Sequence, residues 1–246
     1  MSPILFLFNG RDGRREIIDW SSPANPSDRI MKPLLAIVLF TVGAARADEP
    51  VSKWEKEIAG IEKRLKATPP KPGGVVFAGS SSIRLWDLKK SFPDLAATNV
   101  GFGGSEVRDS SAFAARIILP HEPSAIVFYA GDNDIANKRT PQQVADDYAE
   151  FAKAIHGKLP KCRILFVAIK PSPSRWAFYE SQTQANSLVK VAAANDERLG
   201  YIDVVAPMLG KDGEPKAELF EKDRLHLNAK GYELWTGIVE KALAGK

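Results

Sequence analysis

The sequence predicts an α/β protein, a three-layer α/β/α sandwich whose central sheet is parallel and flavodoxin-like. The first observation behind this prediction is that five short apolar segments alternate with longer segments of helical periodicity. The second is that the apolar segments are continuous, which is typical of strands covered by helices on both faces. The third is the composition, because 246 residues with 44% hydrophobic and 26% charged side chains match an ordinary globular protein and exclude disordered, collagen-like and disulfide-rich classes.

Five apolar segments are expected to form the sheet. The fifth is the weakest, because polar residues interrupt it. Turn-forming residues follow most of them, so each segment has a defined end. The five are VVFA at 75–78, AATNV at 96–100, AIVFYA at 125–130, ILFVAI at 164–169 and YIDVV at 201–205.

Helices are expected before, between and after these strands. Apolar residues in 51–67 recur at three- and four-residue spacings, which predicts an amphipathic helix. Thr140-Pro141 is a favourable cap and first-turn pair for a helix over 141–158. Helical periodicity also covers 106–118, 178–195 and 228–244.

The N-terminal segment has the features of a secretory signal peptide. Met31-Lys32 is followed by the apolar run LLAIVLFTVG at 34–43 and by Ala45-Arg46-Ala47, a small-x-small cleavage site. The apolar run is shorter than the roughly 20 residues that span a bilayer. We therefore expect 31–47 to be a cleaved signal and 1–30 to be a spurious extension of the reading frame. The alternative is a buried apolar helix in a cytosolic protein.

The mature protein is then a single domain, 48–246, that is exported to the periplasm or secreted. No lipobox cysteine follows the apolar run, so we expect no stable membrane anchor. The formal charge of +4 arises from interspersed acidic and basic residues, a pattern that does not indicate nucleic-acid binding. The lone cysteine, Cys162, is expected to be a buried, inert thiol. With three histidines and no ligand set of characteristic spacing, we expect no metal and no cofactor.

Polar residues and glycines gather directly after the first three predicted strands. In parallel sheets, ligands bind at the carboxyl ends of the strands. Acyl transfer by a serine needs a hydroxyl, an imidazole, a carboxylate and donors for an oxyanion, and all four kinds of group are available here. The segments are Gly79–Ser82, Gly101–Gly104, Gly131–Asp134 and, before the last helix, Asp223–His226.

Four sequence blocks resemble those of the SGNH (GDSL-type) hydrolase superfamily. They are FAGSSSIRLW, NVGFGGS, AGDND and DRLHLN, they occur in the family's order, and the resemblance covers residues 74–244. It implies an esterase- or lipase-like hydrolase that needs no cofactor and forms an acyl-serine on a small ester or an acylated carbohydrate or lipid. It also implies a role for each matching residue: Ser81 as nucleophile, His226 as base, Asp223 as the carboxylate, and the Ser81 amide, the Gly104 amide and the Asn133 side chain as the oxyanion hole.

The sequence departs from the family wording at Ser80, where an aspartate is usual, so Ser80 and Ser82 remain alternative nucleophiles. Taken alone, each site residue also has a structural explanation: a helix cap for the serine, a turn for the glycine and the asparagine. Arg175 and Trp176 follow the fourth strand and either bind substrate or, for the tryptophan, pack on a neighbouring helix.

Two other functions are compatible with the same residues. One is an SGNH-fold O-acyltransferase, which would pass the acyl group to a sugar in place of water. The other is a non-catalytic carbohydrate-binding relative that retains the fold. The sequence specifies neither the ester nor the oligomeric state.

Overall fold

The computed structural model describes residues 6–9, 15–18 and 50–245. The chain divides into two compact units, Met1–Ala45 and Arg46–Lys246. In the first, β1 (Phe6–Asn9) pairs antiparallel with β2 (Arg15–Ile18). The expected signal peptide at 31–47 lies outside the described residues, so its assignment stays a prediction.

The second unit contains a five-stranded, all-parallel sheet with the strand order β4-β3-β5-β6-β7. In this order β4 lies at one edge beside β3, and β5, β6 and β7 follow in sequence on the other side of β3. This is the flavodoxin-like order. The α/β fold and its parallel sheet are therefore confirmed. The bounds are β3 (Val75–Gly79), β4 (Ala97–Asn99), β5 (Ala125–Tyr129), β6 (Arg163–Val167) and β7 (Leu199–Ile202).

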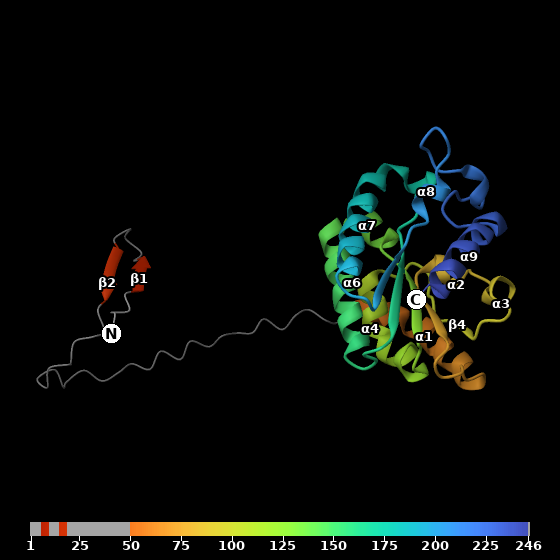
Figure 1. The fold of residues 1–246 in the computed structure, drawn as a ribbon, viewed down its shortest axis with the longest axis horizontal. Coiled ribbons are helices and arrows are strands. Elements are labelled where there is room, and N and C mark those ends of the chain that lie inside the picture. The colour runs from red at the N-terminus through yellow and green to blue at the C-terminus, as the bar shows by residue number, and fades with distance from the viewer. Residues whose placement is uncertain (1–5, 10–14, 19–49, 246) are drawn as a thin grey trace, which may run out of the picture. The chain divides into compact units, whose positions relative to one another are not determined.

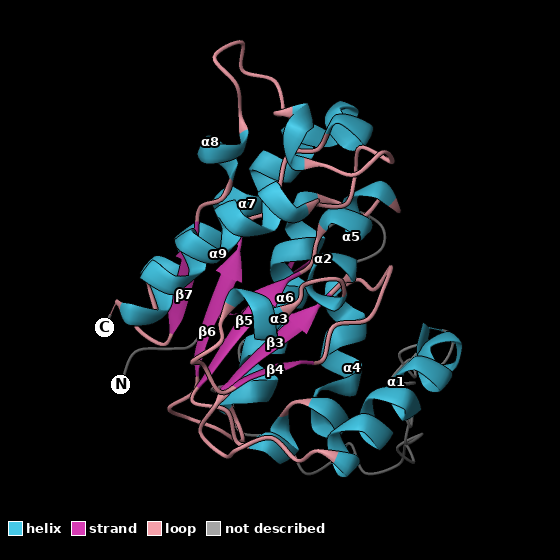
Figure 2. Cartoon of the chain, turned by 90° about the vertical axis from the view of Figure 1, so that its right-hand side faces the viewer, coloured by secondary structure: helices cyan, strands magenta, loops and turns pink. Residues whose placement is uncertain are grey.

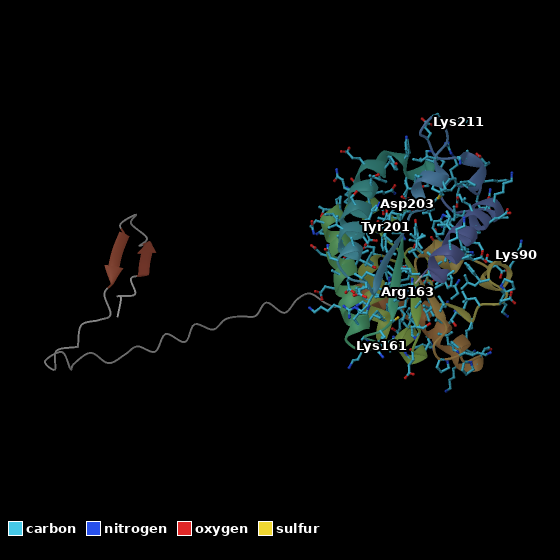
Figure 3. All side chains as sticks on the ribbon, viewed as in Figure 1. Lys90, Lys161, Arg163, Tyr201, Asp203 and Lys211 are labelled. Atoms are coloured by element: carbon cyan, nitrogen blue, oxygen red, sulfur yellow. The ribbon has the colours of Figure 1, made fainter. Side chains whose placement is uncertain are left out.

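The last strand differs from its predicted range of 201–205. It begins at Leu199, which pairs with Ile164 of β6, and it ends at Ile202. It ends there because the Asp203 side chain accepts a hydrogen bond from the Val205 amide at 2.9 Å, which turns the chain into the short helix α8 (Val205–Met208). Figure 3 labels Asp203 at this turn and Lys211 in the loop that follows α8.

Long helices cover both faces of the sheet (Figures 1 and 2). Alternate strand residues point to opposite faces and enter two separate hydrophobic clusters, as for Phe128 in one and Val127 in the other. The first face is covered by α1 (Pro50–Ala67), α4 (Val107–Ile117), α6 (Pro141–His156) and α7 (Tyr179–Ala194), and the second by α9 (Ala229–Ala244) with α3 (Leu88–Ser91) and α8.

Helix starts are fixed by side chains that the sequence makes recognisable. Thr140 caps α6 in a capping box with Gln143, and Pro141 stands in the first turn. The Asn228 side chain accepts from the amides of Lys230 and Gly231 at the start of α9. The single-turn helices were not predicted, because four or five residues are too few to show a helical period.

Cys162 lies directly before β6 and is buried, as expected. Burial raises the pKa of its thiol to about 11, so the reactive thiolate is disfavoured. Among the described residues, no helix combines the length and the apolar character needed to cross a membrane.

Candidate active site

Ser81 stands at a sharp turn that only a glycine permits. β3 ends at Gly79, whose φ is +124°, and a Cβ on this residue would lie 1.9 Å from the carbonyl oxygen of Tyr129 in the neighbouring strand. The Ser80 amide donates to that same oxygen at 2.9 Å. The chain then turns into α2 (Ser81–Arg84), which places Ser81 at the carboxyl edge of the sheet.

The three consecutive serines differ in their access to solvent. Ser80 is 2% exposed and Ser82 is 1% exposed, whereas Ser81 is only half-buried. A nucleophile must reach a substrate atom, so burial favours Ser81 over its two neighbours. Sequence alone left this choice open.

The Asp223–His226 segment brings an imidazole to Ser81 across 145 positions of the chain. The Ser81 hydroxyl oxygen lies 3.0 Å from His226 Nε2, and His226 Nδ1 lies 2.6 Å from Asp223 Oδ2. With Nδ1–H donating to the carboxylate, Nε2 is left as an acceptor for the Ser81 proton. The three side chains form one continuous hydrogen-bonded chain.

The Asp223 carboxylate is held by the loop that carries it. Its other oxygen, Oδ1, accepts hydrogen bonds from the amides of Leu225 and His226 at 2.9 and 3.0 Å, while Arg224 adopts a left-handed φ of +58° between them. Burial would raise the pKa of Asp223, but hydrogen bonds from the His226 side chain and from these amides outweigh it and lower the pKa to about 2. The carboxylate is therefore ionised at neutral pH.

Gly104 lies in the loop that follows β4. Its φ of +79° is in the region that favours glycine, and a Cβ there would stand 3.4 Å from the Trp54 ring. The loop is tied to the serine turn by the Phe102 amide, which donates to the Gly79 carbonyl at 2.9 Å. Gly104 as a whole residue is exposed to solvent.

Asn133 lies in the short helix α5 (Asp132–Ala136), after β5 and on the other side of the serine turn. Its Nδ2 donates to the Ser105 carbonyl at 2.9 Å, which brings Asn133 to the loop that carries Gly104. The serine, glycine and asparagine of the resemblance therefore lie in segments that follow neighbouring strands at one edge of the sheet, and Figure 2 labels α2 and α5 beyond the strand ends.

The residues after β6 make contacts within the protein. Arg175, in the 3₁₀ segment η2 (Pro173–Phe178), donates from Nη2 to Asn133 Oδ1 at 3.0 Å. Trp176 stacks on Tyr179 at the start of α7, with ring centroids 4.3 Å apart. The tryptophan thus packs on a neighbouring helix, and a substrate contact stays a prediction for both side chains.

A buried lysine beneath the site was missed by sequence reasoning. Lys170 is 1% exposed, and its Nζ donates to Asp132 Oδ2 and to the Tyr129 hydroxyl, each at 3.0 Å. The available signal in the sequence was its position directly after the apolar run 164–169, which indicates burial. A buried lysine needs a charged partner.

Asp134 is a second buried acid near the site. One carboxylate oxygen accepts from the Val107 amide at 3.1 Å, and the other has no hydrogen-bond partner among the described residues. Burial raises the pKa of Asp134 to about 7, with the nearby Glu106 adding to the effect. In the described part of the chain, no three His, Cys, Asp or Glu side chains gather in an arrangement that could hold a metal ion.

We expect Asp134 to make the folded state less stable as the pH rises from about 4 to 7. In that range the unfolded chain ionises Asp134 at its ordinary pKa of about 3.9 while the folded chain keeps the proton, so stability falls by at most about 1.4 kcal/mol per pH unit. Asp134→Asn should remove this contribution in urea unfolding measured at several pH values. The exposed Asp94→Asn is the control, and an unchanged pH slope in Asp134→Asn would contradict the expectation.

Comparison with sequence models of protein families identifies one family. The sequence model of the GDSL-like Lipase/Acylhydrolase family matches residues 82–234, a range that begins one residue after Ser81 and includes Asn133, Asp223 and His226. No curated protein is similar enough to count as a relative.

Solved structures show the same fold at low sequence identity. A GDSL-like lipase from Bacteroides thetaiotaomicron is 18% identical, with a TM-score of 0.61 over 78% of this chain and 96% of that one. A carbohydrate esterase family 3 protein from Talaromyces cellulolyticus is 15% identical, with a TM-score of 0.55 over 69% and 95%. A variant of an acetyl-xylooligosaccharide esterase from Geobacillus is 15% identical, with a TM-score of 0.55 over 72% and 97%. Because the family model covers more than half of its length, the chain belongs to the GDSL-like lipase/acylhydrolase family, a family of ester hydrolases.

Proposed function

We propose that the chain is a serine ester hydrolase that acts through an acyl-serine intermediate. The observation that carries this proposal is the hydrogen-bonded chain from Ser81 through His226 to Asp223, with distances of 3.0 and 2.6 Å. Ser81 is the nucleophile, His226 the base and Asp223 the group that holds the imidazole in the required tautomer.

The reaction runs in two halves. Ser81 Oγ passes its proton to His226 Nε2 and bonds to the ester carbonyl carbon, which gives a tetrahedral oxyanion. The oxyanion collapses, the alcohol leaves with the proton from His226, and the acyl group stays on Ser81. Water then gives a proton to His226 and attacks the acyl-serine, and the carboxylic acid leaves as Ser81 regains its proton.

The oxyanion is held by the amides of Ser81 and Gly104 and by the side chain of Asn133. Before the reaction, Asn133 is held by its hydrogen bond to the Ser105 carbonyl, and the loop that carries Gly104 is held by the hydrogen bond from the Phe102 amide to the Gly79 carbonyl. Fixed donors stabilise developing charge without reorganisation, which is why one such donor is worth roughly 10²–10³ in kcat.

The substrate is proposed to be a small ester or an O-acetylated carbohydrate. Neither Ser81 nor His226 lines the described cavities of about 730 and 580 Å³. A short acyl group needs no deep acyl pocket, and a bulky alcohol can stay in solvent. Structural neighbours named as a carbohydrate esterase and an acetyl-xylooligosaccharide esterase support the same class.

A panel of nitrophenyl esters of increasing acyl length tests this proposal. We expect kcat/KM to be highest for the acetyl ester and to fall as the chain lengthens. A preference for long chains would contradict the short-acyl site, and no hydrolysis of any ester would favour the carbohydrate-binding alternative. Added sugars that compete with water for the acyl group would favour the O-acyltransferase.

We further propose that the protein is exported, with 31–47 removed as a signal peptide. The first helix of the described domain begins at Pro50, just after the expected cleavage site, so cleavage would leave this domain intact. Mass spectrometry of exported protein should then find Asp48 as the first residue, and deletion of 1–47 should preserve ester hydrolysis. Exported material that begins at Met1, or loss of the fold on truncation, would contradict this proposal.

A further inference from the structure

An asparagine side chain serves an oxyanion only in one of its two amide orientations. Turned by 180°, the group would present its carbonyl oxygen to the developing negative charge and repel it. The orientation is set by the partners of the two amide atoms. Asn133 therefore needs neighbours that distinguish its oxygen from its nitrogen.

The two neighbours of Asn133 make this distinction. Arg175 Nη2, which can only donate, lies 3.0 Å from Asn133 Oδ1. The Ser105 carbonyl oxygen, which can only accept, lies 2.9 Å from Nδ2. Both contacts would be lost, and replaced by two repulsive ones, if the amide were reversed. One N–H of Nδ2 is used by Ser105, and the second is left for the oxyanion.

Arg175 is itself held by a buried carboxylate. Its Nη1 lies 2.8 Å from Asp132 Oδ1, a charge contact that is not aligned as a hydrogen bond. Asp132 also accepts from Gln182 Nε2 at 3.1 Å and from Lys170 Nζ at 3.0 Å. Burial would raise the pKa of Asp132, but Lys170 and Arg175 outweigh it and hold the pKa below its usual range, so the carboxylate stays charged.

The ion pair of Asp132 with Lys170 is buried and not solvated. Asp132 is 4% exposed and Lys170 is 1% exposed, so neither charge is compensated by water. Breaking a buried pair is far more costly than breaking a surface pair, because it leaves an uncompensated charge. Loss of Arg175 would leave part of the Asp132 charge uncompensated. The Asp132 carboxylate therefore holds Arg175 in place beside Asn133.

We propose that Arg175 is a positioning residue that fixes the Asn133 amide with its N–H toward the oxyanion, and that the Asp132–Lys170 pair anchors it. This inference rests on the proposed oxyanion role of Asn133. It replaces the direct substrate contact expected for Arg175 from the sequence, and it predicts a kcat effect that passes through Asn133.

A double-mutant cycle tests the proposal on the full chain with a short-chain ester. We expect Asn133→Ala to lower kcat by roughly 10²–10³, the usual loss for one oxyanion donor. Arg175→Met should lower kcat by at least about 10-fold with little change in KM, a threshold that follows from partial loss of that donor. The double variant should be no slower than Asn133→Ala within about 3-fold, because residues that act through each other are non-additive.

Arg139→Met is the matched control. Arg139 pairs with Asp147 and its side chain is 18% exposed, against 17% for Arg175, but its ion pair does not include Asn133. It should leave kcat near wild type and combine additively with Asn133→Ala. If Arg175→Met does not fold, as judged by urea unfolding, the cycle is run under the same criterion with Arg175→Ala, which likewise removes the donor to Asn133 Oδ1.

The outcomes separate this inference from the proposed function. If Asn133→Ala keeps the wild-type kcat, the oxyanion assignment and the inference are both overturned. If Asn133→Ala lowers kcat but the fold losses of the two substitutions multiply in the double variant, only the positioning role is overturned. The same holds if Arg175→Met changes KM alone. In either case a substrate contact by Arg175 replaces the positioning role.

Discussion

Replacing Ser81 with alanine is expected to lower kcat for ester hydrolysis by a factor on the order of 10⁶, the usual cost of removing a triad nucleophile. The free energy of unfolding should change by no more than about 0.5 kcal/mol, because the side chain is half-buried and, among the described residues, its hydroxyl hydrogen-bonds with His226 alone. Steady-state kinetics and urea unfolding on the same preparations check both parts.

Ser80→Ala and Ser82→Ala are the controls for this experiment. Both side chains are buried, so we expect neither to reach a substrate and each variant to keep substantial activity. If Ser81→Ala hydrolyses esters at a rate near wild type while one of these controls is inactive, the nucleophile has been assigned to the wrong serine.

The second large effect is expected at His226. His226→Ala removes the group that accepts and returns the Ser81 proton, and kcat should again fall by a factor on the order of 10⁶. Asp223→Asn should cost less, on the order of 10⁴, because an amide keeps Oδ1 for the two backbone donors but turns an N–H toward His226 Nδ1 and favours the wrong tautomer.

His121→Ala is the control for the histidine. His121 lies in the 3₁₀ segment η1 (Leu119–His121), and burial lowers the pKa of its imidazole, yet it contacts neither Ser81 nor Asp223. Its variant should hydrolyse esters at close to the wild-type rate. Equal losses in His121→Ala and His226→Ala would indicate a general effect on folding and would remove the support for a specific base.

The sheet and its long helices were predictable because their signals are local. Continuous apolar runs mark the buried strands, and a Thr-Pro pair marks the start of α6. The end of β7 was not predictable, because it depends on one hydrogen bond from the Val205 amide to the Asp203 side chain. The turns α2 and α5 are too short for periodicity, although they carry Ser81 and Asn133.

The site was predictable only in part, because its residues lie far apart in the sequence. The order of four short blocks indicated Ser81, Asn133 and His226, which the fold brings to one edge of the sheet. The partner of Asn133 was not predictable: Arg175 lies 42 positions away in an irregular segment. The position of Lys170 directly after an apolar run indicated its burial, but its pairing with Asp132, 38 positions away, depends on the fold.

Labelling with a covalent serine reagent tests most directly whether Ser81 is the nucleophile. Treatment of the intact protein with a fluorophosphonate should give one adduct per chain and complete loss of ester hydrolysis. The tryptic peptide that ends at Arg84 contains all three serines, so fragmentation must place the adduct. We predict that it lies on Ser81 and is absent from Ser81→Ala, whereas an adduct on Ser80 or Ser82, or labelling that persists in Ser81→Ala, would contradict the account.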